Sequence, residues 1–78
     1  MSDVARMLLE IDGGNETFDV HGLGCFCDKI ESQLRSHGAT HIEFYLPMGS
    51  FIVAHCMLPL DRMDEVRYIA GVQNISVD

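Results

Sequence analysis

Two cysteines separated by a single residue, Cys25 and Cys27, are the pair in this chain best suited to direct chemistry. Two thiolates can hold Cu(I) almost linearly, and soft sulfur prefers Cu(I) or Zn to hard ions. On a helix, a one-residue spacing points the two side chains about 200° apart, and Cys27 then shares an apolar stripe with Ile30 and Leu34. Buried free cysteine is common in such stripes. The pair is therefore either a soft-metal site or a helix start with one buried thiol, and the sequence leaves both open.

Three histidines add a second candidate chemistry. A histidine pair across antiparallel strands, such as His41 and His55, can share a zinc ion with a nearby thiol or with Glu43. The alternative is that these imidazoles flank an interface.

Cys25 with His21 as its base could also form a nucleophile pair. Because the sequence has no phosphate loop, no nucleophile elbow and no His-Glu-x-x-His motif, we expect a protein that is not an enzyme.

The length and hydrophobic content predict one domain with apolar surface that its own core cannot bury. The 78 residues form a single domain, residues 1–78, and 47% of them are hydrophobic. A chain of this size buries only about 60% of its unfolded surface, so one small core cannot hide that much apolar area. We therefore expect a homodimer or a subunit docked on another protein.

The charge is strongly acidic. Twelve Asp and Glu against five Lys and Arg give a net charge of −7. Such a chain repels phosphate backbones, which argues against direct binding of nucleic acid. Its acidity suits a basic protein partner, including one whose own nucleic-acid groove is positively charged, although charge also simply favours solubility.

The cysteine count and the residues at the start of the chain predict that the protein is located in the cytoplasm. Three cysteines is an odd number, and the opening "MSDVARMLLEID" carries acids and Arg6 where an apolar signal core would run. No apolar run approaches the roughly 18 residues that a membrane-spanning helix requires. We expect reduced thiols and no membrane segment.

The first third of the chain predicts a strand and an opening hairpin. In residues 5–11, Met7, Leu9 and Ile11 alternate with polar residues, with Leu8 as the exception. "DGGN" at 12–15 breaks the strand, and alternation over residues 17–21 predicts a second hairpin arm. "GLG" at 22–24 is then expected to be a flexible joint.

Two helices and three further strands follow. Residues 25–37 carry apolar residues at helical spacing, and Gly38 supplies the C-terminal stop. Residues 40–46 and 51–58 predict two strands around a turn, and residues 72–77 predict a last one. A second helix is expected after Pro59 and Leu60; its expected N-cap is Asp61, its inward residues are Met63, Val66, Ile69 and Ala70, and Gly71 ends it. The order matches an α+β ferredoxin-like split βαβ sandwich (βαββαβ), with an antiparallel sheet, two helices on one face and an extra N-terminal hairpin strand.

The turn at Pro47-Met48-Gly49 decides which side chains face away from the helices. A type I turn with Gly49 as a bulge pairs Leu46 with Ser50 and sets His41 across from His55. A two-residue turn would reverse the faces of the whole second strand, but it needs Met48 at an unfavourable positive φ. With the first register, the helix side carries Ile42, Phe44, Leu46, Ile52, Ala54, Cys56 and Leu58, and the open side carries His41, Glu43, Tyr45, Phe51, Val53, His55 and Met57.

The stretch "TFDVHGLGCFCDKIESQL" and the two strands after it, residues 17–58, resemble the heavy-metal-associated domain of copper chaperones and metal-pumping ATPases. The positions that line up are Gly22, Leu23, Gly24 and Cys25 with the family's Gly-Met-Thr-Cys loop, and Lys29, Ile30, Glu31 and Leu34 with its helix. The resemblance implies the split βαβ plan and Cu or Zn held by Cys25 and Cys27. Two features depart from it: Leu23 and Gly24 replace the family's Met and Thr, and Phe26 alone separates two cysteines that the family spaces by two residues.

Two functions are consistent with the sequence. The first is a small acidic, non-enzymatic protein-binding or regulatory module without a cofactor, which contacts its partner through the open sheet face; the simplest version is self-association. A sharper version is an inhibitor of a nucleic-acid-handling complex, of the phage-encoded anti-defence type. The expected contact residues are Glu43, Tyr45, Phe51, Val53, His55 and Met57. The second function is a soft-metal binding protein or metallochaperone that uses Cys25 and Cys27.

Overall fold

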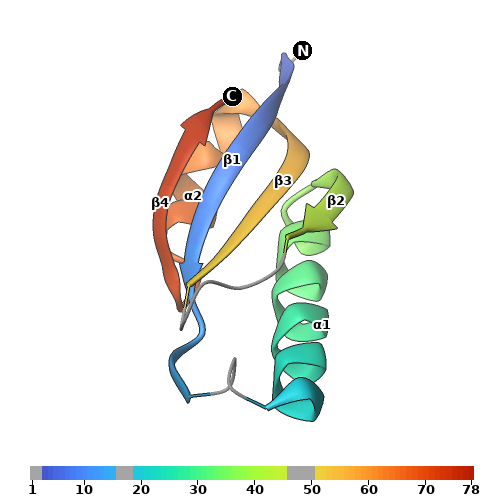
Figure 1. Cartoon of the computed structure of the whole chain (residues 1–78). Helices are drawn as coiled ribbons and strands as arrows, with labels where there is room; N and C mark the ends of the chain where they lie inside the picture. The colour runs from blue at the N-terminus through green and yellow to red at the C-terminus, as the bar shows by residue number, and fades with distance from the viewer. Residues whose placement is uncertain (1–2, 16–18, 46–50) are drawn as a thin grey trace.

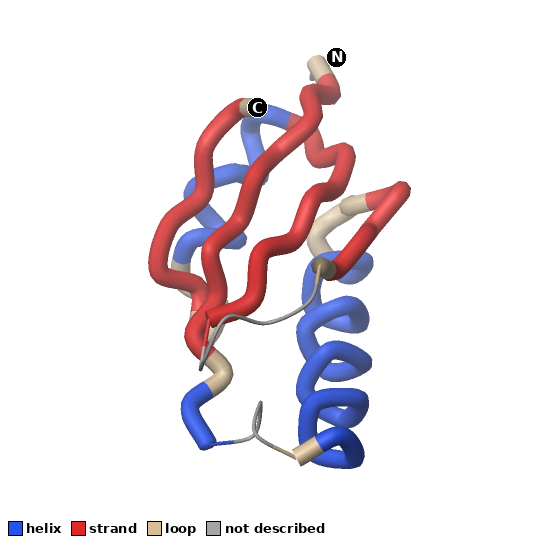
Figure 2. Tube along the Cα trace, in the orientation of Figure 1, coloured by secondary structure: helices blue, strands red, loops and turns tan. Residues whose placement is uncertain are grey.

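A computed structural model describes residues 3–15, 19–45 and 51–78 of the chain. These residues form an α+β fold with a four-stranded antiparallel sheet and two α-helices, as expected (Figures 1 and 2). The elements in chain order are β1 (Val4–Asp12), α1 (Val20–Ser36), β2 (Thr40–Phe44), β3 (Phe51–Pro59), the 3-10 turn η2 (Leu60–Arg62), α2 (Met63–Arg67) and β4 (Val72–Val77). Within the described ranges, neither helix has the length and apolar character needed to cross a membrane.

The strand order in the sheet is β2-β3-β1-β4, and each neighbouring pair is antiparallel. The two long central strands, β1 and β3, therefore lie between two shorter edge strands, as Figure 2 shows. The connection from β1 through α1 to β2 passes over β3, and the connection from β3 through α2 to β4 passes over β1. Residues far apart in the sequence thus meet across the central pair.

The core forms between the two helices and one face of the sheet. Side chains along a strand alternate between its faces, so every second residue of β1 and β3 is buried and the residues between them are not. Both helices contribute buried residues to the same cluster, which places them on the same face. The buried hydrophobic residues are Met7, Leu9, Ile11, Phe26, Ile30, Leu34, Ala39, Ile52, Ala54, Cys56, Leu58, Val66, Ile69 and Ile75.

Helix α1 begins earlier than the sequence predicted, and this overturns the extra hairpin strand. Val20 and His21, expected in a second hairpin arm, lie in the first turn of α1, while residues 17 and 18 lie outside the described part. Gly22 and Gly24, expected in a flexible joint, are helical. The reason is an N-cap: Asp19 is extended, and its carboxylate accepts a hydrogen bond from the Gly22 amide at 3.1 Å. A good cap outweighs the weak helix propensity of two glycines.

The C-terminal end of α1 agrees with the prediction. Gly38 adopts a φ of +92°, and its amide donates to the carbonyl of Arg35 at 3.0 Å. The Ala39 amide donates to the carbonyl of Leu34, also at 3.0 Å, and both of these side chains are buried. This is a Schellman motif with its hydrophobic contact, and it turns the chain directly into β2.

The pairing of β2 with β3 corrects the predicted register. Glu43, and not His41, lies opposite His55, while Thr40 pairs with Met57. Between them β2 carries a bulge, where His41 takes a φ of +53°. At Glu43 and Phe44 the register differs from the preferred prediction by two residues, which preserves the faces of these side chains, whereas at Thr40, on the other side of the bulge, it differs by one. The assignment of inward and outward residues on β3 is therefore confirmed, although the predicted turn, residues 46–50, lies outside the described part.

The second helix is shorter than expected. Asp61 lies inside η2 and not at an N-cap, and α2 spans only five residues. Val66 and Ile69 are buried as predicted, whereas Ala70 is exposed. Gly71 ends the segment with a φ of +96°. With so short a helix, the chain has already turned towards β4 at residue 70.

Two glycine substitutions test these local structures in opposite directions. A Cβ at Gly71 would meet the Asp12 carbonyl oxygen at 3.0 Å from a left-handed backbone, so Gly71→Ala should lower the free energy of unfolding by about 1–3 kcal/mol. A Cβ at Gly24 meets nothing within 4 Å, so Gly24→Ala should raise it by up to about 1 kcal/mol. Urea titration of the two variants measures both effects. A destabilised Gly24→Ala chain would contradict the early start of α1.

Candidate functional site

The candidate site is the sheet face that neither α1 nor α2 covers, which we call the open face. It consists of the side chains that alternate with the core residues along the four strands. Its members are Arg6, Leu8 and Glu10 of β1, Glu43 and Tyr45 at the end of β2, Phe51, Val53, His55 and Met57 of β3, and Asn74, Ser76 and Asp78 at the end of the chain. All six residues that the sequence predicted for partner binding lie on it.

Apolar side chains cover much of the open face. Tyr45 is 44% exposed and Phe51 is 49% exposed. Val53, Met57 and Leu8 beside them are half-buried. Aromatic residues and Met are the types enriched in the centres of protein interfaces. The open face therefore combines accessible area with anchor residues of the appropriate kind.

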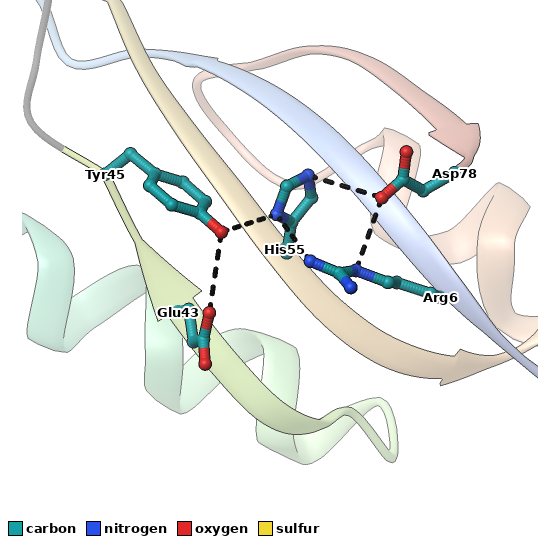
Figure 3. A network of polar contacts seen from close by, with 5 residues as sticks. All are labelled: Arg6, Glu43, Tyr45, His55 and Asp78. Atoms are coloured by element: carbon teal, nitrogen blue, oxygen red, sulfur yellow. Dashed lines mark hydrogen bonds and ion pairs between the residues drawn. The ribbon is translucent and has the colours of Figure 1, made fainter.

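A chain of polar contacts crosses the open face next to these residues (Figure 3). His55 on β3 lies at its centre: its Nδ1 is 2.9 Å from the Tyr45 hydroxyl and 3.2 Å from Nη2 of Arg6. Its Nε2 is 3.6 Å from a carboxylate oxygen of Asp78, which also lies 3.3 Å from Nε of Arg6. The Tyr45 hydroxyl lies 3.5 Å from Glu43. The imidazole of His55 thus contacts Tyr45, Arg6 and Asp78, and Glu43 joins the network through the Tyr45 hydroxyl.

The Arg6 contact favours one tautomer of His55. A guanidinium has only N–H donors, so a hydrogen bond from Arg6 requires Nδ1 to accept, and the single hydrogen of the Tyr45 hydroxyl is then directed at Nδ1 rather than at Glu43. The hydrogen of the neutral imidazole then lies on Nε2, on the side of Asp78. The side chain of His55 is only 19% exposed and meets the Tyr45 ring edge-on at a centroid distance of 5.0 Å. These contacts orient Tyr45; the exposed Arg6–Asp78 pair adds little stability by itself.

The open face is acidic and slightly hollow. Three carboxylates, those of Glu10, Glu43 and Asp78, surround the apolar patch, and Arg6 is the one cation among the members of this face. A depression of about 440 Å³ lies beside the β2 bulge, because the bulge twists β2 away from β3. Its lining residues are Arg6, His41, Glu43, His55, Cys56 and Met57.

The cysteines lie elsewhere, on α1 and in the core. Cys25 is exposed, with its Sγ 3.8 Å from Nε2 of His21 one helical turn away, whereas Cys27 is half-buried against the core. Burial raises the pKa of the Cys27 thiol, and the neighbouring Asp28 carboxylate raises it further. Burial also raises the pKa of Cys56. Within the described part of the chain, no three His, Cys, Asp or Glu side chains are grouped as metal ligands.

Two of the five residues in the polar network, Arg6 and Asp78, were not among the residues predicted from the sequence. The alternation of β1 already placed Arg6 opposite the core residues, but no local pattern showed that its neighbours would be particular residues of β3 and β4. That order brings Arg6 beside His55, 49 residues later in the chain. Asp78 joins them because β4 pairs with β1, and its amide donates to the carbonyl of Arg6 at 2.9 Å. Pairing between strands that are distant in the sequence, rather than a local motif, creates the site.

Comparison of the chain with protein-family models gives no match, and comparison with curated proteins gives none either. Function is therefore inferred from the chemistry of this surface.

The tautomer of His55 is directly measurable. We expect the neutral imidazole to carry its hydrogen on Nε2, in wild type and in Tyr45→Phe, because Arg6 still faces Nδ1 in that variant. Two-bond ¹H–¹⁵N NMR correlations distinguish the tautomers. His41 is the internal control, since its Nδ1 contacts the Thr40 hydroxyl, which can donate or accept. A dominant Nδ1–H form of His55 would contradict the Arg6 contact.

Proposed function

We propose that this protein is a small, acidic, non-enzymatic binding module whose open face docks on a basic protein surface. The single observation that carries the proposal is the exposure of Tyr45 and Phe51 on a sheet face that no described helix covers. A buried aromatic anchor contributes more to binding than any other kind of contact residue, apart from arginine. The half-buried Val53 and Met57 supply the apolar surround that excludes water from such anchors.

The charge of the open face supports a basic partner. The carboxylates of Glu10, Glu43 and Asp78 would face the partner, while the positive charge of Arg6 is already engaged by Asp78 at 3.3 Å. Two copies of this face would bring like charges together, so a second copy is disfavoured here. Lysines and arginines on the partner would complement it. A protein with a positively charged nucleic-acid groove fits this description, and blocking that groove would make the module an inhibitor of a nucleic-acid-handling complex, of the anti-defence type.

The architecture and compartment complete the proposal. We assign the β2-β3-β1-β4 sheet with its two crossing helices to the ferredoxin-like class, in which one sheet face is left free by the helices. The proposed compartment is the cytoplasm, where thiols stay reduced; Cys25, Cys27 and Cys56 are all free. Self-association of the chain is also part of the proposal, through a surface other than the open face.

Removal of an aromatic anchor from the open face tests the proposal. The immobilised chain is expected to retain a basic protein from a cell extract, and Phe51→Glu should weaken that binding by at least about tenfold by removing an anchor. Binding should also weaken as salt is raised, because the partner's cations are screened. Quantitative mass spectrometry and a titration with the retained protein measure both effects.

The matched control is Val20→Glu. Val20 is 87% exposed in the first turn of α1, away from the sheet, and an acid there suits the helix dipole. This variant adds the same charge to an exposed apolar position, so it should bind like wild type. Equal retention by wild type and Phe51→Glu, or selective retention of acidic proteins, would refute the proposed function.

A soft-metal site on α1 is the second candidate, favoured by the 3.8 Å contact between Cys25 Sγ and His21 Nε2. The thiolate is the form that binds metal, and the raised pKa of Cys27 disfavours that form at neutral pH. Side chains at 25 and 27 also diverge on a helix, whereas those at 21 and 25 lie on one face. In this alternative, Cys25 with His21 holds the ion and Cys27 packs against the core.

Titration with Cu(I) under reducing conditions tests the alternative. Stoichiometric binding is expected to be lost in Cys25→Ser, weakened in His21→Gln and retained in Cys27→Ser. A competing chelator sets the affinity scale. Absence of binding at micromolar Cu(I), or equal loss in the two cysteine variants, would count against this site.

A further inference from the structure

We propose that the free edge of β4 pairs with the β4 edge of a second copy of this chain, which extends the sheet across a twofold axis. This inference names the surface for the self-association in the proposed function and leaves the open face available for the basic partner. Figure 2 shows β4 as the outermost strand at one side of the sheet, with no described segment beyond it.

The hydrogen-bonding pattern identifies which backbone groups of β4 point outward. The Asp78 amide donates to the Arg6 carbonyl at 2.9 Å, so Asp78 and Arg6 form a hydrogen-bonded pair. In an antiparallel ladder such pairs recur at every second residue, so Ser76 and Asn74 also bond to β1. The amides and carbonyls of Gln73, Ile75 and Val77 therefore point away from the sheet. Among the described residues, no other strand pairs with them.

The two edges of the sheet differ in their protection. Natural proteins protect exposed edges with short strands, bulges and charges. The β2 edge has all three, with five residues, the bulge at His41 and the charge of Glu43. In contrast, β4 has no charged residue and no proline from Val72 to Val77, and its irregularity is confined to the start of the strand. An unprotected edge of this kind is a template for another strand.

One register makes the β4 edge complementary to itself. If the twofold axis passes through Ile75, Gln73 pairs with Val77 of the second copy, and Val77 pairs with Gln73 of that copy. Every outward amide and carbonyl of the strand then finds a partner. Val77, 55% exposed in one copy, gains a covering neighbour. The antiparallel arrangement leaves both helix layers on the same side of one continuous sheet.

Charge favours this register over its neighbours. With the axis at Ile75, Asp78 lies opposite Val72 of the other copy, and the two Asp78 residues are about 20 Å apart, well beyond the screening length. An axis at Val77 would bring the two Asp78 carboxylates close together. An axis at Gln73 would leave Val77 unpaired. Because each copy carries a net charge of −7, the dimer should strengthen as salt is raised, opposite to binding by the open face.

Amide hydrogen exchange and sedimentation together test the pairing. Wild type should sediment at twice its 8.7 kDa chain mass at high concentration. Under these conditions the amides of Gln73, Ile75 and Val77 should exchange as slowly as those of Asn74 and Ser76, which bond within one copy. Dilution to the monomer should speed exchange of the first group alone.

Two variants of the β4 edge and two control variants test whether this edge forms the dimer interface. Val77→Lys and Gln73→Lys place a charge at exposed positions of the β4 edge, and each should give a monomer that still binds the basic partner. Thr40→Lys places the same charge on the exposed β2 edge and should remain dimeric. Phe51→Glu should also remain dimeric, which separates failure of this inference from failure of the proposed function.

Disulfide trapping tests the register. In a Cys25→Ser background, a mixture of Asn74→Cys and Ser76→Cys chains should cross-link, because these positions face each other about 4.5 Å apart between Cα atoms. Neither chain alone should do so, since identical positions lie about 8 Å apart, too far for a disulfide. A chain that stays monomeric at about 1 mM in high salt, where millimolar dissociation constants are detected, would overturn the inference. So would a dimer that tolerates both lysine variants.

Discussion

The arrangement of this protein depends on one constraint: two helices cover one face of a four-stranded sheet, and strand geometry sends every second side chain to the other face. In β3 the consequence is clearest. Ile52, Ala54, Cys56 and Leu58 are buried, while the residues that alternate with them, including the apolar Phe51, Val53 and Met57, stay at least partly accessible. A strand that is apolar on both faces would be expected between two covering layers. Here no described helix covers the second apolar face, so its side chains stay accessible.

The central position of β1 converts this apolar face into an organised one. Because β1 lies between β3 and β4, Arg6 reaches both His55 and Asp78, and the imidazole in turn contacts the Tyr45 hydroxyl. These contacts between exposed or partly exposed groups contribute little to stability. Their consequence is orientation: an accessible aromatic ring held in one position loses less side-chain entropy when a partner binds it.

The two edges of the sheet, β2 and β4, differ in structure. At β2, the bulge and the left-handed backbone of His41 prevent extension of the sheet and create the depression next to Glu43. At β4, a regular and uncharged edge remains. A face and an edge of one sheet point in perpendicular directions, so the two proposed contact surfaces do not overlap. The electrostatics separate them further, since acidic residues surround the face and are absent from the edge strand.

The sequence by itself determined the alternation of the strands, the end of α1 at Gly38 and the face on which each residue of β3 lies, because these depend on local period and on single residues with special backbone freedom. It also placed all six predicted contact residues on the open face. The start of α1 was missed because the Asp19 cap competed with an apparent strand alternation. The β2 register was missed because no residue pattern in this strand revealed the extra residue of the bulge. Only the tertiary structure decided that Arg6 and Asp78 join His55 and that β4 is a free edge. Strand order arises from long-range pairing, and no local pattern of residues encodes which strand lies beside which.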